Sequence, residues 1–217
     1  MDNQAGARQP YRIVTPPSAA TMACKRAFDI LCSFLGLAVL SPVLLVVSVL
    51  VAVTSPGGVF FRQERIGKDG RPFRIFKFRS MRKDNAGLKI TTGNDSRITP
   101  VGRFLRKSKI DELPQLINVL VGDMSFVGPR PEVADYVNLY TPYQRQVLLV
   151  RPGITGLASI RFRNENDLLT ASDDPNRTYV EQIMPRKIDL DLEYIPHASV
   201  FYDIKLIFQT FVVVIKE

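Results

Sequence analysis

The chain has 217 residues, a formal net charge of +8 and a pI near 9.7, and 46% of its residues are hydrophobic. Its length suits a single domain with at most an appendage. The excess of Lys and Arg predicts an anionic partner, such as nucleic acid, phospholipid headgroups or nucleotide phosphates. The two cysteines, Cys24 and Cys32, do not indicate a disulfide framework, and the sequence has no His/Cys cluster with zinc spacing.

The N-terminal quarter of the chain predicts a membrane helix. Residues 1–24 are largely polar and are expected to form a flexible arm. Residues 30–54 carry no charge, and a run of roughly 20 apolar residues is long enough to span a bilayer. Ser41 and Pro42 lie near the middle of this run. The proline is expected to kink the helix, and the serine can satisfy a carbonyl that the proline leaves unpaired.

The charges around this helix leave two topologies open. Basic residues flank the apolar run on both sides, with Lys25 and Arg26 before it. The positive-inside rule places such flanks in the cytoplasm, which favours a re-entrant helix over residues 25–55. The alternative is an ordinary kinked span.

The remaining chain, residues 56–217, is expected to form one domain at the cytoplasmic membrane interface. Two β-rich runs flank a turn at residues 68–70 and predict an antiparallel hairpin. In the second run Lys77 and Arg79 share one face, where they could grip a diphosphate or line a solvated edge. The rest is expected to be helical, and the last helix, from about Tyr202, either lies on the membrane surface or packs in the core. The predicted fold class is α+β, mainly α with a small antiparallel hairpin.

Two adjacent acids, Asp111 and Glu112, open a predicted helix over residues 113–120, with Pro114 in its first turn. Acids at a helix start cap free N–H groups and suit the helix dipole, so a structural role would explain the pair. Glycoside hydrolysis fits poorly, because it needs carboxylates about 5 to 9.5 Å apart on opposite sides of a bond.

Phosphoryl transfer fits the acidic pair better. A carboxylate can attack a phosphate and form an acyl phosphate, and Mg²⁺ held by one or two carboxylates would neutralise the charge. Arginines and lysines would converge on the remaining phosphate oxygens. The candidates are Lys77, Arg79, Arg106, Arg130 and Arg151. No "GxxxxGK" or "GxGxxG" loop is present, so the sequence does not predict a P-loop or Rossmann site.

Several motifs, in order, resemble those of the bacterial sugar transferases that are monotopic phosphoglycosyl transferases. They are "KRAFDI", "RQERIGKDGRPFRIFKFRSM", "SKIDELPQL", "VGDMSFVGPRPE" and "RPGITGLA". The resemblance implies an enzyme that moves a sugar-1-phosphate from a UDP-sugar to polyprenyl (undecaprenyl) phosphate and releases UMP. Such a reaction begins glycoconjugate assembly at the cytoplasmic face of the bacterial inner membrane. The resemblance also implies Mg²⁺ as cofactor.

The same resemblance implies roles for individual residues. Asp111 would be the nucleophile that carries the phosphosugar, and Glu112 would assist in the Mg²⁺ site or in activating the acceptor. Ser41 and Pro42 match the kink of a re-entrant helix. The predicted substrate-binding residues are Lys77, Arg79, Arg106, Arg130 and Arg151.

Some features of function stay open. After "RPGITGLA" many relatives continue with a Gln-Val-Asn-Gly-like stretch, whereas this chain reads "SIRFRNEND", so the sugar is not determined. Two other classes are a membrane-tethered nucleic-acid binder and a non-catalytic membrane scaffold. No recognisable nucleic-acid-binding module is present, so no nucleic-acid partner is expected. A homodimer is left open.

Overall fold

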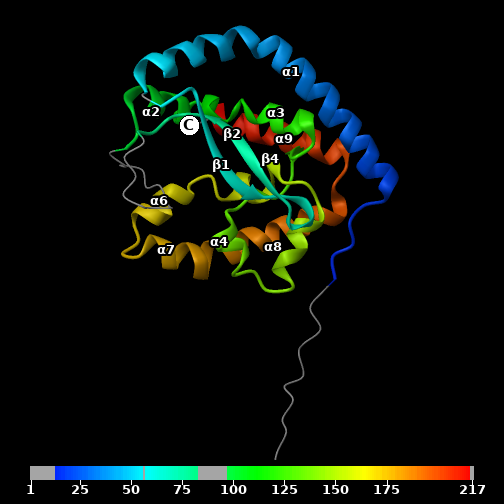
Figure 1. Ribbon diagram of the computed structural model, residues 1–217. Helices are drawn as coiled ribbons and strands as arrows, with labels where there is room; N and C mark the ends of the chain where they lie inside the picture. Colours follow the sequence, from blue (N-terminus) through cyan, green and yellow to red (C-terminus); the bar gives the residue numbers. More distant parts are fainter. Residues whose placement is uncertain (1–12, 56, 83–96, 216–217) are drawn as a thin grey trace, which may run out of the picture.

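The computed structural model describes residues 13–55, 57–82 and 97–215. Figure 1 shows one long curved helix running over a body of shorter helices and small β-sheets. The expected class, mainly α with a small antiparallel hairpin, is confirmed. Residues 1–12 of the predicted arm lie outside the described residues.

The long helix, α1 (Ala19–Thr54), begins earlier than residue 25, where the sequence had placed its start. By length and composition alone, it could cross a membrane. It continues through Pro42, and the Ser41 hydroxyl donates to the Ala38 carbonyl at 2.8 Å. Because proline has no N–H to offer that carbonyl, the serine supplies the missing donor.

Buried polar side chains dock the start of α1 on the body. Lys25 is 4% exposed and forms an ion pair with Asp203 of α9 (Val200–Ile215). Asp29 is 2% exposed and accepts from the Ser125 hydroxyl at 3.1 Å. Charges are buried in proteins only when they are paired, so these contacts fix the start of the helix. Lys25 is therefore a buried structural charge, and its predicted cytoplasmic placement stays a prediction.

Apolar packing docks the other end of α1. Val47 and Val51 are buried in a cluster with Phe78 and Leu105. Burying such side chains contributes about 1.5–3 kcal/mol each. The outward face of α1 is apolar and exposed, and it includes Leu31, Phe34, Val39, Leu45, Val49 and Val53. Both ends of α1 therefore lie on the same body, while its outer face stays uncovered.

The hairpin forms where the sequence predicts it. Strands β1 (Phe60–Ile66) and β2 (Pro72–Phe78) pair antiparallel through the short turn η1 (Lys68–Gly70). Asp69 has φ 57° and Gly70 has φ 74°. Glycine adopts this left-handed conformation without strain and aspartate tolerates it, so the turn residues suit a tight hairpin.

The chain then folds back under the hairpin through α2 (Pro100–Lys107), the single turn η2 (Ile110–Glu112) and α3 (Gln115–Val121). Asn118 of α3 joins this segment to the free edge of β2. Its side-chain oxygen accepts from the Phe76 N–H at 2.9 Å, and its amide donates to the Arg74 carbonyl at 2.9 Å. One fully buried side chain thus replaces a neighbouring strand.

The acidic pair does not lie in the first turn of the following helix, so that prediction is wrong. Asp111 and Glu112 lie in η2, and Pro114 precedes α3. Lys109 has φ 57°, which breaks the helical path between α2 and η2. The pair therefore occupies its own turn between two helices.

The second half of the chain is helical except for one short sheet that the sequence did not predict. Strand β3 (Ser125–Val127) pairs in parallel with β4 (Gly153–Thr155). Residues 144–149, which belong to the region expected to be helical, form a 3₁₀ helix, η3 (Gln144–Leu149). The other elements are α4 (Ala134–Val137), α5 (Leu157–Arg161), α6 (Glu165–Thr170), α7 (Pro175–Thr178), the π-helical η4 (Tyr179–Ile183), α8 (Met184–Tyr194) and η5 (Ile195–His197).

Of the two roles that the sequence left open for the last helix, α9, the structure shows packing in the core. Asp203 and Leu206 are 0% and 1% exposed and face the body. Phe201, Phe208 and Phe211 are 88%, 68% and 62% exposed. Helical spacing separates these two faces, so α9 is a core helix that also presents aromatic side chains outward.

Candidate active site

The acidic pair lies against the hairpin, where three segments meet. Both β2 and α2 contact η2. The Lys77 Nζ atom lies 2.6 Å from Glu112 Oε1, and Arg130 donates to the same oxygen at 3.1 Å. Lys77 is on β2 and Arg130 is in the loop after β3. The structure thus brings together three of the predicted residues around one carboxylate oxygen.

Electrostatics make Glu112 the counter-ion of this cluster. Lys77 and Arg130 hold the pKa of the Glu112 carboxyl well below its usual range, against the effect of burial. Glu112 in turn raises the pKa of Arg130. Burial lowers the pKa of Lys77, and Glu112 opposes that shift. Glu112 is therefore ionised and holds the two cations in place.

Asp111 is in a different state from its neighbour. It is 6% exposed, and no hydrogen bond or ion pair reaches its carboxylate within the part of the chain that the structure describes. Burial raises its pKa, while Lys77 is the main charge that lowers it. A buried carboxylate without donors is costly to keep, and such groups are often functional.

Close packing of α2 positions this turn. A Cβ atom at Gly102 would lie 2.0 Å from the Ser80 carbonyl oxygen, so the helix backbone rests directly on the end of the hairpin. The Thr99 hydroxyl caps α2 by accepting from the Gly102 N–H at 2.9 Å. Arg106 lies in the last turn of α2 and lowers the pKa of Asp111. Only glycine permits this close approach, and it directs Arg106 towards the acidic pair.

Arg79 has a different environment from Lys77. It follows β2, and its backbone N–H donates to the Val59 carbonyl at 2.9 Å. Its guanidinium donates to the Phe60 carbonyl at 3.4 Å. These contacts are with the hairpin itself and not with Glu112.

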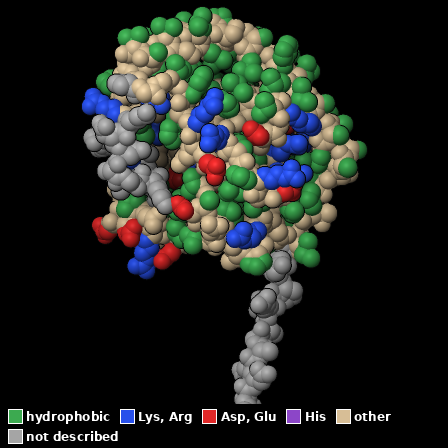
Figure 2. All heavy atoms as spheres, in the orientation of Figure 1, with side chains coloured by type: hydrophobic (Ala, Val, Ile, Leu, Met, Phe, Trp, Pro, Cys, Tyr) green, Lys and Arg blue, Asp and Glu red, His purple; other side chains and the backbone are tan. Residues whose placement is uncertain are grey.

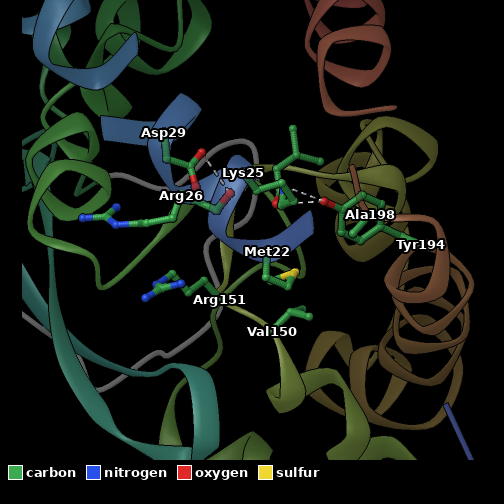
Figure 3. Close-up of a pocket in the computed structure, with 10 residues that line it drawn as sticks. Met22, Lys25, Arg26, Asp29, Val150, Arg151, Tyr194 and Ala198 are labelled. Atoms are coloured by element: carbon green, nitrogen blue, oxygen red, sulfur yellow. Dashed lines mark hydrogen bonds between the residues drawn. The ribbon is translucent and has the colours of Figure 1, made fainter. Parts of the chain in front are cut away.

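Arg151 lies at the far end of α3. Its Nε–H donates to the Gly122 carbonyl at 2.8 Å, just after the helix. Arg26 of α1 donates to the Val119 carbonyl at 2.5 Å and the Leu120 carbonyl at 2.8 Å. Figure 3 shows both guanidinium groups pointing to the same side of a small pocket, away from Tyr194.

This position separates Arg151 from the acidic pair. The seven residues of α3 rise about 10 Å between its two ends. Asp111 and Glu112 precede its first turn, whereas Arg151 bonds the carbonyl after its last turn. The structure therefore does not bring Arg151 to the other predicted site residues.

Sequence reasoning missed Arg65, Glu132 and Tyr179. Arg65 lies opposite Phe73 in the hairpin, on the face that also carries Lys77. It is 3.6 Å from Glu132, which accepts a hydrogen bond from the Tyr179 hydroxyl. The period-two pattern of the first strand, combined with the hairpin register, could have indicated Arg65. No local pattern indicates Tyr179.

Among the predicted site residues that the structure describes, the acidic pair supplies the candidate metal ligands. No group of three or more His, Cys, Asp or Glu side chains gathers as a metal site among residues 13–55, 57–82 and 97–215. Asp111 and the Oε2 atom of Glu112 have no donor in the described structure. Mg²⁺ is typically held by one or two carboxylates together with substrate phosphates, which matches this donor set.

The sequence profile of a protein family described as "Bacterial sugar transferase" matches residues 20–217. The chain belongs to the bacterial sugar transferase family. The match covers the acidic pair, the hairpin, the loop of Arg130 and all of α1 except its first residue.

Characterised relatives of this bacterial sugar transferase include larger proteins. It is 43% identical over 202 residues to the UDP-glucose:undecaprenyl-phosphate glucose-1-phosphate transferase of Escherichia coli (strain K12), covering 90% of this chain and 41% of the relative. It is 39% identical over 199 residues to the UDP-N-acetylgalactosamine-undecaprenyl-phosphate N-acetylgalactosaminephosphotransferase of Aeromonas hydrophila, covering 89% of this chain and 44% of the relative. The chain thus spans about two fifths of the length of these relatives.

A relative of similar length is the exopolysaccharide production protein PSS of Rhizobium leguminosarum bv. phaseoli. The two are 41% identical over 198 residues, covering 87% of this chain and 93% of the relative. The names of the relatives differ in the sugar that they state, so membership of the family does not identify the sugar for this chain.

Proposed function

We propose that this chain is a phosphoglycosyl transferase that moves a sugar-1-phosphate from a UDP-sugar to undecaprenyl phosphate. An Asp111 oxygen attacks the β-phosphorus of the donor, the bond from that phosphorus to the bridging oxygen breaks, and UMP leaves with the electron pair. The acceptor phosphate then attacks the acyl phosphate, which forms the polyprenyl-diphosphate sugar and regenerates Asp111.

One observation carries this proposal. Asp111 is a buried carboxylate that accepts from no donor among the described residues, next to Glu112, whose charge holds Lys77 and Arg130 in place. A nucleophile needs free lone pairs, and attack on a diphosphate needs cations close to the reacting oxygens. A purely structural cap would instead use its oxygens on backbone N–H groups.

Lys77 and Arg130 each have further N–H groups that could donate to a substrate. In the described structure Arg130 uses only one terminal nitrogen on Glu112, and Lys77 uses one of its three N–H bonds. Arginine can bind a phosphate with two parallel hydrogen bonds, and lysine acts as a point charge. We assign both to the donor diphosphate, with Arg106 beside the nucleophile.

Mg²⁺ is the proposed cofactor, and the residues present fit it. Asp111 and Glu112 Oε2 are the oxygen ligands that the acidic pair offers. When bound, Mg²⁺ would offset the negative charge that gathers when a carboxylate meets a diphosphate. The protein's own contribution is to hold the two carboxylates side by side in η2 and to exclude water by burying Asp111.

The docking of α1 supports a re-entrant membrane topology. Lys25 near its start and Val51 near its end both pack on the catalytic body. Figure 2 shows hydrophobic and uncharged atoms along the upper edge of the molecule, over the middle of α1. We infer that α1 enters and leaves the same face of the membrane, with Ser41 and Pro42 at its bend. Phe201 and Phe208 of α9 would lie at headgroup depth on the cytoplasmic side.

The test is a transfer assay with the purified chain in lipid, undecaprenyl phosphate, Mg²⁺ and a panel of UDP-sugars. The proposal predicts UMP release with at least one donor, dependent on the acceptor and abolished by EDTA. A folded, membrane-bound protein that releases no UMP with any donor would contradict it and favour a scaffold. Salt-sensitive DNA binding that survives Asp111→Asn would favour a nucleic-acid binder.

A further inference from the structure

Glu132 lies two residues after Arg130 and outside the predicted site. We propose that Glu132, Arg65 and Tyr179 are positioning residues that hold Arg130 in place for the donor diphosphate. This inference rests on the proposed function and extends the site from the acidic pair to the loop that carries Arg130.

The side chain of Glu132 joins a strand to a helix. Its carboxylate accepts from the Tyr179 hydroxyl and lies 3.6 Å from the Arg65 guanidinium. Arg65 also donates to the Pro131 carbonyl at 3.2 Å. It therefore contacts both the backbone of the Arg130 loop and the Glu132 side chain. The Tyr179 ring packs on Tyr136, with 5.0 Å between centroids. One hydrogen bond, from Tyr179, and one ion pair, with Arg65, therefore hold the Glu132 carboxylate.

The backbone of the loop is fixed on both sides of Arg130. The Glu132 carbonyl accepts from the Ile66 N–H at 2.9 Å, at the end of β1. The Pro129 carbonyl accepts from the Gly153 N–H at 2.9 Å, at the start of β4. Arg130 is thus held between two anchored neighbours, which restricts the direction of its side chain.

Charge explains why Glu132 is needed there. Arg65 and Arg130 are close enough for each charge to affect the other: burial lowers the pKa of Arg65, Arg130 adds to that shift, and Glu132 opposes it. Without Glu132, two neighbouring guanidinium groups would repel each other in a partly buried site. Arg130 would then be pushed from its place on Glu112.

Tyr179 also occupies an unusual backbone position. It begins η4, a π-helical turn between α7 and α8. Such turns occur mostly as local distortions of α-helices, frequently at functional sites. Here the distorted turn begins at the residue that bonds Glu132, as expected of a positioning element.

The test is a double-mutant cycle between Glu132→Gln and Arg130→Met, measuring kcat and KM for the UDP-sugar. Glu132→Gln alone should lower kcat/KM about 10- to 100-fold, because a misplacement of about 1 Å can have that effect. In the Arg130→Met background the same change should lower kcat/KM by less than about 2-fold, since the group it positions is gone.

A matched pair of tyrosines supplies the control. Tyr179→Phe should lower kcat/KM about 5-fold, the effect of losing one hydrogen bond. Tyr136→Phe removes the hydroxyl of the neighbouring tyrosine, which donates to Asn176 and not to Glu132, and should leave kcat/KM within about 2-fold of wild type. If Glu132→Gln does not fold, Tyr179→Phe takes its place in the cycle.

Equal losses in both backgrounds would assign Glu132 to general stability and overturn the inference. Wild-type kinetics in Glu132→Gln would overturn it as well. A wild-type protein without turnover would instead remove the proposed function, and this inference with it, so the two failures are distinguishable.

Discussion

The two ends of α3 use arginine in opposite ways. Before its first turn, Arg130 pairs with Glu112, and the adjacent Asp111 has no donor in the described residues. After its last turn, Arg151 and Arg26 donate to backbone carbonyls. The first end is the proposed reactive end, where the Asp111 carboxylate has no partner among the described residues, and at the other end the arginines satisfy backbone carbonyls.

The comparison teaches that the unpaired group, and not the arginine, marks the reactive end. The last carbonyls of any helix lack partners, and cations there also suit the helix dipole. Arg26 and Arg151 therefore stabilise the fold by donating to these carbonyls. At the other end Lys77 and Arg130 pair with the Glu112 carboxylate and keep further N–H donors that a phosphate could use.

The largest expected effect is the loss of turnover when Asp111, at the proposed reactive end of α3, is replaced. Asp111→Asn should lower turnover about 10⁴-fold or more, because an amide cannot act as the nucleophile. Asp123→Asn is the matched control at the other end of the helix, where Asp123 accepts from Asn118 at 3.2 Å. The control should keep turnover within about 3-fold of wild type. Full activity in Asp111→Asn would remove it from the mechanism.

The second prediction compares the two kinds of arginine directly. Arg130→Met should lower kcat/KM about 10²- to 10³-fold, because it removes a donor that faces the developing charge. Arg151→Met should leave kcat/KM within about 3-fold and lower the free energy of unfolding by about 1 kcal/mol, because it removes a bond to the Gly122 carbonyl. Steady-state kinetics and thermal unfolding in lipid would measure both. The reverse ranking would place the diphosphate at the far end of α3.

The third prediction uses stability instead of rate. Asp111→Asn should raise the free energy of unfolding by about 1 kcal/mol, because it removes a buried carboxylate without donors. Glu112→Gln should lower it by about 2 kcal/mol, because Lys77 and Arg130 lose their counter-ion. Glu112→Gln should also slow turnover. Equal signs for the two stability changes would contradict the different states assigned to these neighbours.

The smallest expected effect is the pH dependence of the stability gained by Asp111→Asn. The pKa of Asp111 is raised in the folded chain, so the folded state holds its proton more tightly than the unfolded state. The wild type should therefore lose stability as the pH rises from the ordinary value of 3.8 to the raised value, and no further above it. The advantage of Asp111→Asn should grow over that window. A pH-independent difference between the two proteins would show that the folded pKa is not raised.

The sequence predicts the elements whose signals are local. The hairpin follows from alternating residues around a turn at residues 68–70, and Lys77 follows from period two along its second strand. The apolar run of α1 is also local. The proximity of Lys77, Arg130 and Glu112 could be expected only from the family resemblance, because these residues are far apart in the sequence.

The features of the fold and the site that the sequence did not predict depend on contacts between segments that are distant in the sequence. Arg151 follows a loop whose direction no local pattern specifies, and it turns to the Gly122 carbonyl. Strands of three residues, such as β3 and β4, are too short for periodicity to indicate. The left-handed conformation of Lys109 moves the acidic pair out of the helix that its sequence appeared to open. The pairing of Arg65 with Glu132 could not be predicted locally, because the two residues are 67 positions apart.

The most direct test is intact-mass analysis of the chain after mixing with UDP-sugars and Mg²⁺ in the absence of acceptor. The mechanism predicts one added sugar phosphate on the wild type, its loss when undecaprenyl phosphate is added, and no adduct on Asp111→Asn. An adduct of the same mass on Asp111→Asn, or turnover in a wild type that never carries one, would contradict it.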